Sequence, residues 1–136
     1  MFKLFFATPE KKVVAESELE EISLPAFSGE LQILPGHAPL MTTLDAGILR
    51  YKLKNGESQN LAISWGYCQI SSDGVTVLAE TAVNAQEIDS KVVQKHLLEN
   101  ENLMLNQSLD DKQWEKAQHE IARLRAEIEL LSEKAH

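Results

Sequence analysis

The sequence has little cysteine, no long apolar run and no excess of basic residues, and each shortage excludes a class of protein. Cys68 is the only cysteine, so no disulfide can form within the chain, and a reducing, cytoplasmic location is expected. The longest apolar runs fall far short of the ~20 residues that a membrane-spanning helix requires. The apolar start of the chain carries no cleavage signature, so we interpret it as a strand and not as a signal peptide.

Charge is spread evenly along the chain, and its net value is −8. Residues 1–85 hold six basic and ten acidic residues, and residues 86–136 hold seven and eleven, so each part carries −4. A protein that follows a phosphate backbone needs a basic face. The distribution therefore argues against nucleic-acid binding.

The sequence also lacks a recognisable set of catalytic or metal-binding residues. It has no glycine-rich phosphate loop. No sequence motif places a candidate nucleophile beside a base and an orienting group. The four histidines show neither His-x-x-x-His nor cysteine-paired spacing. We expect no catalytic residue and no metal site, and we expect two of the histidines on helix surfaces, His96 and His119. The other two are His37 and His136.

Short alternating runs of apolar and polar residues fill most of residues 1–84. Runs at 2–8, 11–17 and 18–24 predict three strands in the first part of the chain. Many short strands separated by turn residues are typical of a β-sandwich or barrel with antiparallel pairing, and not of alternating strands and helices. The pattern therefore predicts an all-β N-terminal domain.

The strongest short-range turn signal is Asn55-Gly56, which predicts a hairpin with a type I′ turn. In the strand that follows, alternation places Leu61, Ile63 and Trp65 on one face. The pattern therefore predicts a hairpin that presents these three side chains to the same side.

The stretch 28–47, SGELQILPGHAPLMTTLDAG, holds three of the six glycines and two of the four prolines. Pro35-Gly36 fits the centre of a type II turn, because proline presets the first φ and glycine tolerates the positive φ that follows. Pro39 forces the residue before it towards an extended backbone. The result is a stiff loop that presents His37, and such a loop is either a tight corner or a contact surface.

The strand alternation stops near residue 84, which divides the chain into a domain at 1–84 and another at 85–136. Asp89 is the predicted N-cap of a helix that ends at residues 106–107. The polar run ENEN at 99–102 interrupts the apolar stripe of this helix. The first helix is therefore expected to pack weakly.

A second helix carries the clearest pattern in the sequence. Ser108 is its predicted N-cap, since Asp111 follows three residues later. A short connection to the first helix predicts an antiparallel helical hairpin. That hairpin is either permanent, or it opens and presents its apolar seam to another protein. The seam has heptad spacing and consists of Trp114, Ala117, Ile121, Leu124, Ile128 and Leu131.

The stretch 28–47 resembles the corresponding loop of the epsilon subunits of F-type ATP synthases. Gln32 stands where that family has glycine, which affects only the local backbone. The resemblance continues at 75–82, 87–89 and 121–135, in the correct order along nearly the whole chain. The matching positions in the loop are Gly29, Glu30, Ile33, Leu34, Pro35, His37, Ala38, Pro39, Leu40, Thr42, Leu44 and Gly47.

This resemblance implies a flattened sandwich of about ten short strands followed by a C-terminal α-helical hairpin. It implies a non-catalytic subunit of the rotary central stalk, on the cytoplasmic face of the bacterial inner membrane. Residues 1–84 would bind the gamma subunit and the c-ring, and the membrane would be contacted only through the complex. The residues implied at this interface are Glu30, Leu31, Pro35, His37 and Pro39.

The resemblance also implies a regulatory role for residues 85–136. The second helix, with Arg123, Arg125 and Lys134, would extend towards acidic helices of the catalytic beta subunits and block ATP hydrolysis. Such a change is a population shift between a folded and an extended hairpin.

Some bacterial members of the family bind regulatory ATP through an I-D-x-x-R-A motif that opens the first helix. The first two positions are present here as Ile88 and Asp89, but Val92 replaces the arginine. Lys91, Arg123 and Arg125 are candidates to replace the missing charge. No other cofactor is implied.

Two other classes of protein fit parts of the pattern. The first is a free-standing β-sandwich adaptor with a coiled-coil tail, which would have no need of a gamma subunit. The second is a small-molecule sensor or enzyme, which would require a deep pocket with converging polar groups.

Overall fold

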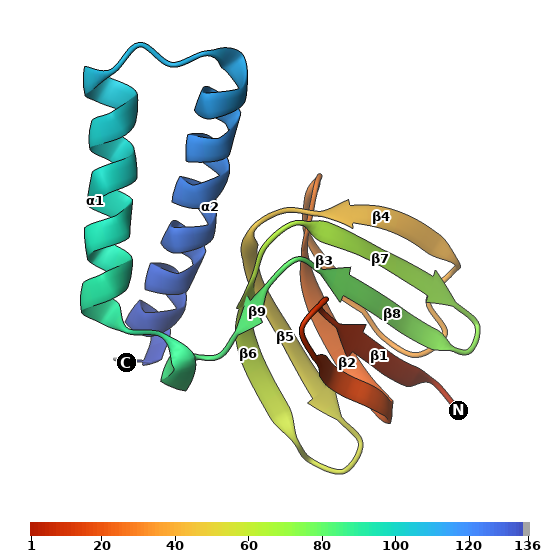
Figure 1. Ribbon diagram of the computed structural model, residues 1–136. Coiled ribbons are helices and arrows are strands. Elements are labelled where there is room, and N and C mark those ends of the chain that lie inside the picture. Colours follow the sequence, from red (N-terminus) through yellow and green to blue (C-terminus); the bar gives the residue numbers. More distant parts are fainter. Residues whose placement is uncertain (135–136) are drawn as a thin grey trace.

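The computed structural model describes residues 1–134 as a β-sandwich with a two-helix hairpin beside it (Figure 1). The side chain of Lys134 and residues 135–136, which include the fourth histidine, His136, lie outside the described part. The nine strands are β1 (Lys3–Ala7), β2 (Lys12–Ala26), β3 (Gly29–Ile33), β4 (Leu40–Leu44), β5 (Gly47–Leu53), β6 (Ser58–Ile63), β7 (Gly66–Ser71), β8 (Gly74–Ala79) and β9 (Ala82–Val83).

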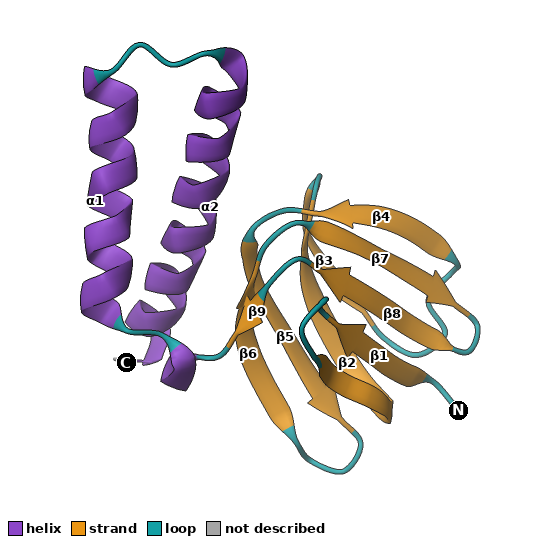
Figure 2. Cartoon of the chain, viewed as in Figure 1, coloured by secondary structure: helices purple, strands orange, loops and turns teal. Residues whose placement is uncertain are grey.

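Strand β2 belongs to both layers of the sandwich, because its two halves pair with different strands. Its first half pairs with β1, and its second half lies between β3 and β5. One layer therefore runs β4–β7–β8–β1–β2 and the other runs β3–β2–β5–β6–β9. Figure 2 shows both layers as strands and the hairpin as the only long helices. The predicted fold class, a β-sandwich followed by a helical hairpin, is confirmed.

Two details of the strand prediction were wrong. The runs at 11–17 and 18–24 form one 15-residue strand, β2, because no glycine, proline or asparagine interrupts residues 12–24. Strands β1 and β8 pair in parallel, whereas the other pairs are antiparallel as predicted. The parallel pair brings the N-terminal strand beside a strand formed about seventy residues later in the chain, which local alternation cannot reveal.

The core lies between the two layers. It consists of every second side chain along the longer strands, the ones that point inward. Phe6 and Leu4 are fully buried at its centre, together with residues such as Leu49 from β5 and Val77 from β8. No member of this cluster lies beyond Ala82. Because burial of apolar surface is the main stabilising term, residues 1–85 contain their own core and the hairpin is an addition to it.

The hairpin between β5 and β6 differs from the predicted type I′ turn. A type I′ turn needs a positive φ at both central residues, but of these two residues only Gly56 has one, at 96°. The amide of Gly56 donates to the carbonyl of Leu53 (3.0 Å), and the amide of Leu53 donates to the carbonyl of Glu57 (2.8 Å). This is a three-residue loop in which glycine occupies the bulge position. The Asn55 side chain accepts from the Glu57 amide (2.8 Å), which stabilises the loop.

Gly66 begins β7 where the strand passes close to β8. A Cβ atom at this position would lie 1.8 Å from the carbonyl oxygen of Leu78, a backbone atom that cannot move aside. We expect Gly66→Ala to lower the free energy of unfolding by about 1–3 kcal/mol, because overpacking forces a backbone shift. Denaturant unfolding followed by circular dichroism measures the loss. Gln69→Ala, at an exposed position of the same strand, should stay within about 0.5 kcal/mol of the wild type; an equal loss in both variants would contradict the clash.

The two helices have well-defined starts. A short 3-10 turn, η1 (Ala85–Glu87), leads to α1 (Ser90–Asn106), and Asp89 caps α1 as predicted by accepting from the amides of Lys91 and Val92. Helix α2 spans Asp111–Lys134. Its N-cap is Asp110 and not Ser108: the Asp110 carboxylate accepts from the Gln113 amide (2.8 Å), and the Gln113 side chain accepts from the Asp110 amide (3.1 Å). This reciprocal pair is a capping box.

Candidate interaction surfaces

The loop between β3 and β4 contains the type II turn that the sequence predicts. The amide of His37 donates to the carbonyl of Leu34 (3.1 Å), which closes a turn with Pro35 and Gly36 at its centre, and Gly36 has a φ of 91°. The His37 ring nitrogen Nδ1 lies 2.7 Å from the carbonyl oxygen of Ala38. The turn is therefore fixed by hydrogen bonds within the loop, and the loop is anchored at both ends by strands β3 and β4.

The residues expected at the partner interface surround this loop. Glu30 is exposed on β3, while Leu31 is half-buried against the core. Pro35 and Pro39 are exposed, and His37 is half-buried. The loop also exposes large apolar side chains that were not among the residues expected at the interface: Leu34 at 50%, Leu40 at 41% and Met41 at 63%. We call residues 34–41 the loop surface.

Helix α2 has two apolar faces, of which the sequence predicted only one. The predicted seam packs on α1, and its central members Ala117, Ile121 and Leu124 are buried. Trp114, at the start of the seam, is 43% exposed near the tip of the hairpin. The second face consists of Ala126 and Leu130, which pack with Ala62 and half-buried residues of β5, β9 and the η1 region: Ile48, Val83, Ala85 and Ile88.

Two polar contacts accompany this second face. The Arg50 guanidinium on β5 donates two hydrogen bonds to the Glu133 carboxylate, one of them 2.9 Å long from Nη1 to Oε2. This pairing lowers the pKa of Glu133 and raises the pKa of Arg50, because each charge stabilises the other. Since both side chains are more than a third exposed, the pair is worth no more than about 1 kcal/mol. That contribution is present above the ordinary glutamate pKa and is lost as the pH falls through the lowered pKa.

The other contact is a stack of the Trp65 and His119 rings, with centroids 3.7 Å apart and planes 8° from parallel. It corrects one prediction and confirms another. Trp65 does not share a face with Leu61 and Ile63, because β6 ends at Ile63 and the alternation stops there. His119 is exposed on the surface of α2 as predicted, on the side that faces Trp65 and the cleft between α2 and the sandwich. We call the Arg50–Glu133 pair, this stack and the Ala126–Leu130 contact the docking contacts.

Arg123 is engaged within its own helix. Its guanidinium donates to Glu120 and, from Nη1 at 2.9 Å, to Glu127. Burial raises the pKa of Glu127, while the charge of Arg123 lowers it. Arg125 points elsewhere: it is 65% exposed, and its guanidinium lies 4.0 Å from the carboxylate of Glu101 on α1.

Four of the candidate ATP residues lie at different places. Asp89 caps α1, and Ile88 packs beside the Ala126–Leu130 contact. Arg123 lines a cleft of 570 Å³ between α2 and the sandwich, whereas Arg125 lines a cleft of 390 Å³ between the two helices. The two arginines therefore line different clefts. ATP binding through these four residues stays a prediction, and their placement gives it no support.

Within residues 1–134, no group of three or more histidine, cysteine, aspartate or glutamate side chains is arranged to hold a metal ion. None of the helices in that range is long and apolar enough to cross a membrane. Cys68 is fully buried, and burial raises the pKa of its thiol to about 12. What the fold does present is an apolar loop and a helical hairpin held by few contacts.

These features define a class of protein: a β-sandwich that carries a two-helix hairpin and offers surfaces to other proteins. The sequence model of the family described as ATP synthase, Delta/Epsilon chain, beta-sandwich domain matches residues 1–85. The ATP synthase epsilon chain of Bdellovibrio bacteriovorus is 47% identical over 128 residues, which cover 93% of this chain and 91% of the relative. The ATP synthase epsilon chain of Geobacter sulfurreducens is 42% identical over 112 residues, 82% of this chain and 80% of the relative. The chain therefore belongs to the ATP synthase epsilon chain family.

Solved structures share the same fold. A chain in the mitochondrial ATP synthase of Euglena gracilis, determined as an OSCP/F1/c-ring assembly, superimposes with a TM-score of 0.80 at 22% identity, over 99% of this chain and 81% of that one. A chain in the central stalk/c-ring structure of Tetrahymena thermophila mitochondrial ATP synthase gives a TM-score of 0.72 at 14% identity, over 96% of both chains. The predicted family is confirmed, and as a member the chain is a non-catalytic subunit of an ATP synthase.

Proposed function

We propose that this chain works in the rotary central stalk of a proton-translocating bacterial ATP synthase. Its sandwich binds the gamma subunit and the c-ring, and so couples rotation of the ring to catalysis elsewhere in the complex. Its hairpin regulates ATP hydrolysis by changing between a docked and an extended form. The subunit sits at the cytoplasmic face of the inner membrane and reaches the membrane only through the complex.

The loop surface supports the first part of the proposal. A loop fixed by a type II turn and by two core strands loses little conformational entropy on binding. Leu34, Leu40 and Met41 expose apolar area beside the half-buried His37, and such area on a rigid loop is typical of a protein contact. We assign Glu30, Leu31, Pro35, His37 and Pro39, with these three apolar residues, to the contact with the c-ring and its neighbours.

The docking contacts support the second part. Helix α2 is held to the sandwich by one buried leucine, two alanines and the half-buried apolar residues around them, together with an ion pair and one ring stack. Burial of a leucine contributes about 1.5–3 kcal/mol, a stack about 0.5–1.5 kcal/mol, and an exposed ion pair about 0–1 kcal/mol. Contacts with another subunit can supply a free energy of this size. Helix α2 can therefore exchange between a form docked on the sandwich and a form bound elsewhere.

A comparison of the full chain with residues 1–85 tests this function. An ATP synthase catalytic complex depleted of its epsilon chain is titrated with each form, and both ATP hydrolysis and binding to gamma are measured. We expect both forms to bind gamma, because residues 1–85 contain their own core, and only the full chain to inhibit hydrolysis. Equal rates of ATP hydrolysis, with both forms bound to gamma, would contradict the proposal that the hairpin regulates hydrolysis. Failure of both to bind gamma would favour the adaptor alternative.

A further inference from the structure

We propose that the Trp65–His119 stack makes the docking of α2 sensitive to pH, because a charged His119 ring holds the helix on the sandwich more strongly than a neutral one. This inference rests on the proposed exchange between docked and extended hairpins and identifies what shifts its balance. His37 belongs to the loop surface and His96 to α1, whereas His119 lines the cleft between α2 and the sandwich.

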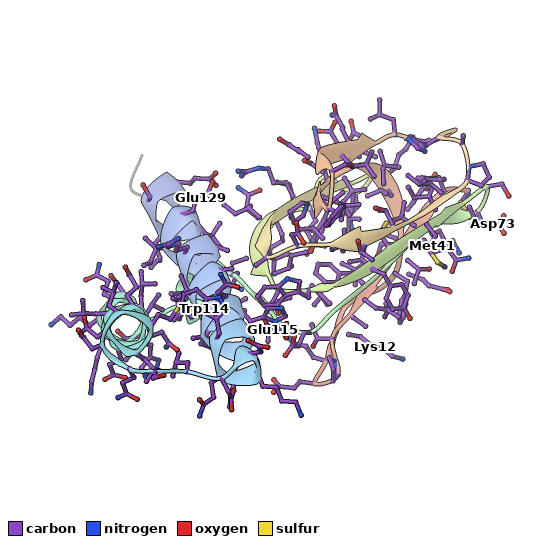
Figure 3. All side chains as sticks on the ribbon, turned by 90° about the horizontal axis from the view of Figure 1, so that it is seen from above. Lys12, Met41, Asp73, Trp114, Glu115 and Glu129 are labelled. Atoms are coloured by element: carbon purple, nitrogen blue, oxygen red, sulfur yellow. The ribbon has the colours of Figure 1, made fainter. Side chains whose placement is uncertain are left out.

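The stack joins the two parts of the chain that separate when the hairpin extends. Trp65 lies between β6 and β7 and is half-buried, and its ring is face to face with that of His119 on α2, 3.7 Å between centroids and 8° from parallel. Figure 3 shows Glu115, one turn before His119, on the side of α2 that faces the sandwich. The two rings therefore meet only in the docked form.

Protonation of His119 changes the kind of contact that the two rings make. Two neutral rings gain from stacking alone, whereas a cation over the face of a tryptophan is also attracted by its π electrons. Histidine is the side chain that ordinarily changes its charge between about pH 5 and about pH 8. The docked form is therefore stabilised at the acidic end of this range, and that stabilisation is lost as the pH rises through it.

The charged groups around His119 divide into those that move with it and those that stay on the sandwich. Five charged residues of α2 line the same cleft and accompany the ring in both forms: Lys112, Glu115, Lys116, Glu120 and Arg123. From the sandwich, the charged residue of that lining is Glu80, whose amide donates to the Trp65 carbonyl (2.8 Å). The Glu80 carboxylate attracts a positive ring only in the docked form, so it acts in the same direction as Trp65.

The other docking contacts do not change charge between mildly acidic and neutral pH. The ion pair lowers the pKa of Glu133 and raises the pKa of Arg50, so both stay charged. The Ala126–Leu130 contact contains no titratable group. Burial raises the pKa of Glu127 on α2, which is a second group that could bind a proton, and a variant of His119 separates the two.

The pH dependence of docking in the full-length chain tests the inference. Hydrogen exchange of α2 amides is measured at about pH 6 and about pH 8, within the range where histidine changes charge. The rates are corrected for the intrinsic effect of pH, and amides of β5 and β8 serve as the internal reference. We expect the docking equilibrium constant of the wild type to be at least about twofold larger at the lower pH, as for an exposed cation–π contact.

Two variants fix the charge of His119, and circular dichroism checks that each is folded. His119→Gln is always neutral, and His119→Arg is always charged and keeps a planar group that stacks on tryptophan. Both should lose the pH dependence: His119→Gln should dock as weakly as the wild type at high pH, and His119→Arg at least as strongly as the wild type at low pH. Trp65→Leu removes the other ring and repeats the test if a His119 variant does not fold.

Three results would overturn the inference. The first is equal docking of the wild type at both pH values. The second is wild-type pH dependence in His119→Gln, which would assign the effect to another group such as Glu127, and the third is wild-type pH dependence in Trp65→Leu. None of these results bears on the proposed function, which fails instead if the full-length chain does not inhibit ATP hydrolysis by the epsilon-depleted complex.

Discussion

Replacing Leu130 by aspartate is expected to release α2 from the sandwich while the sandwich stays folded. Leu130 is 3% exposed and packs with Ala62 and Ala126 at the centre of the docking contacts. A carboxylate at this point would be desolvated in the docked form and hydrated in the released form. We expect this difference to exceed about 3 kcal/mol, the cost of burying an uncompensated charge. That cost is comparable with the whole of the docking interaction estimated above.

Hydrogen exchange distinguishes release from unfolding. In Leu130→Asp, amides of α2 should lose protection, whereas amides of β1, β5 and β8 should keep it, because the sandwich core contains no residue beyond Ala82. Leu98→Asp is the matched control, since Leu98 is 61% exposed on α1. Protection of α2 at the wild-type level in Leu130→Asp would show that the docking contacts hold the helix more strongly than their size indicates.

Release also has a functional consequence under the proposed regulation. A larger extended fraction should increase the inhibition of ATP hydrolysis by the full chain, because the extended form is the inhibitory one. The ratio between forms changes about tenfold for each 1.4 kcal/mol. Titration of an epsilon-depleted complex with Leu130→Asp measures this effect, and Leu98→Asp serves again as the comparison.

The local parts of the fold were predictable because their signals lie within a few residues of one another. Pro35-Gly36 fixes its turn through backbone preferences alone, and Asp89 caps α1 through its own side chain. The prediction of Ser108 as the cap of α2 was wrong, because Asp110 also has a polar residue three positions later, Gln113, and forms the capping box with it. When the capping motif occurs at two neighbouring positions, the sequence alone does not identify the residue at which the helix begins.

The docking contacts were not predictable from local pattern. Arg50 and Glu133 stand 83 positions apart, and nothing near either residue indicates the other. The second face of α2 contains alanine and one leucine beside a strong heptad seam, so its apolar signal is weak. Trp65 was assigned to the wrong side because the end of β6 is set by the pairing of Ile63 with Ala82 in β9, a contact made by the tertiary fold.

The positive charges of α2 have unequal freedom, which refines their predicted role in inhibition. Arg123 pairs with Glu120 and Glu127, and both partners lie on α2 and move with it. Its charge is therefore largely balanced in the docked and in the extended helix alike. Arg125 faces Glu101 of α1, so opening of the hairpin separates the two and leaves Arg125 available to an acidic partner. The side chain of Lys134 lies outside the described part of the chain.

Reversing the charge of Arg125 is therefore expected to weaken inhibition of ATP hydrolysis more than reversing the charge of Arg123. A like charge placed against acidic helices costs several kcal/mol, so we expect Arg125→Glu to require at least about tenfold more protein for half-maximal inhibition. Arg123→Glu should shift this value less and should mainly destabilise α2, because it would face Glu120 and Glu127. Titration of the epsilon-depleted complex measures both, and the affinity for gamma, expected to be unchanged, serves as the control for assembly. Equal inhibition by Arg125→Glu and the wild type would exclude an electrostatic contact of this residue with the catalytic subunits.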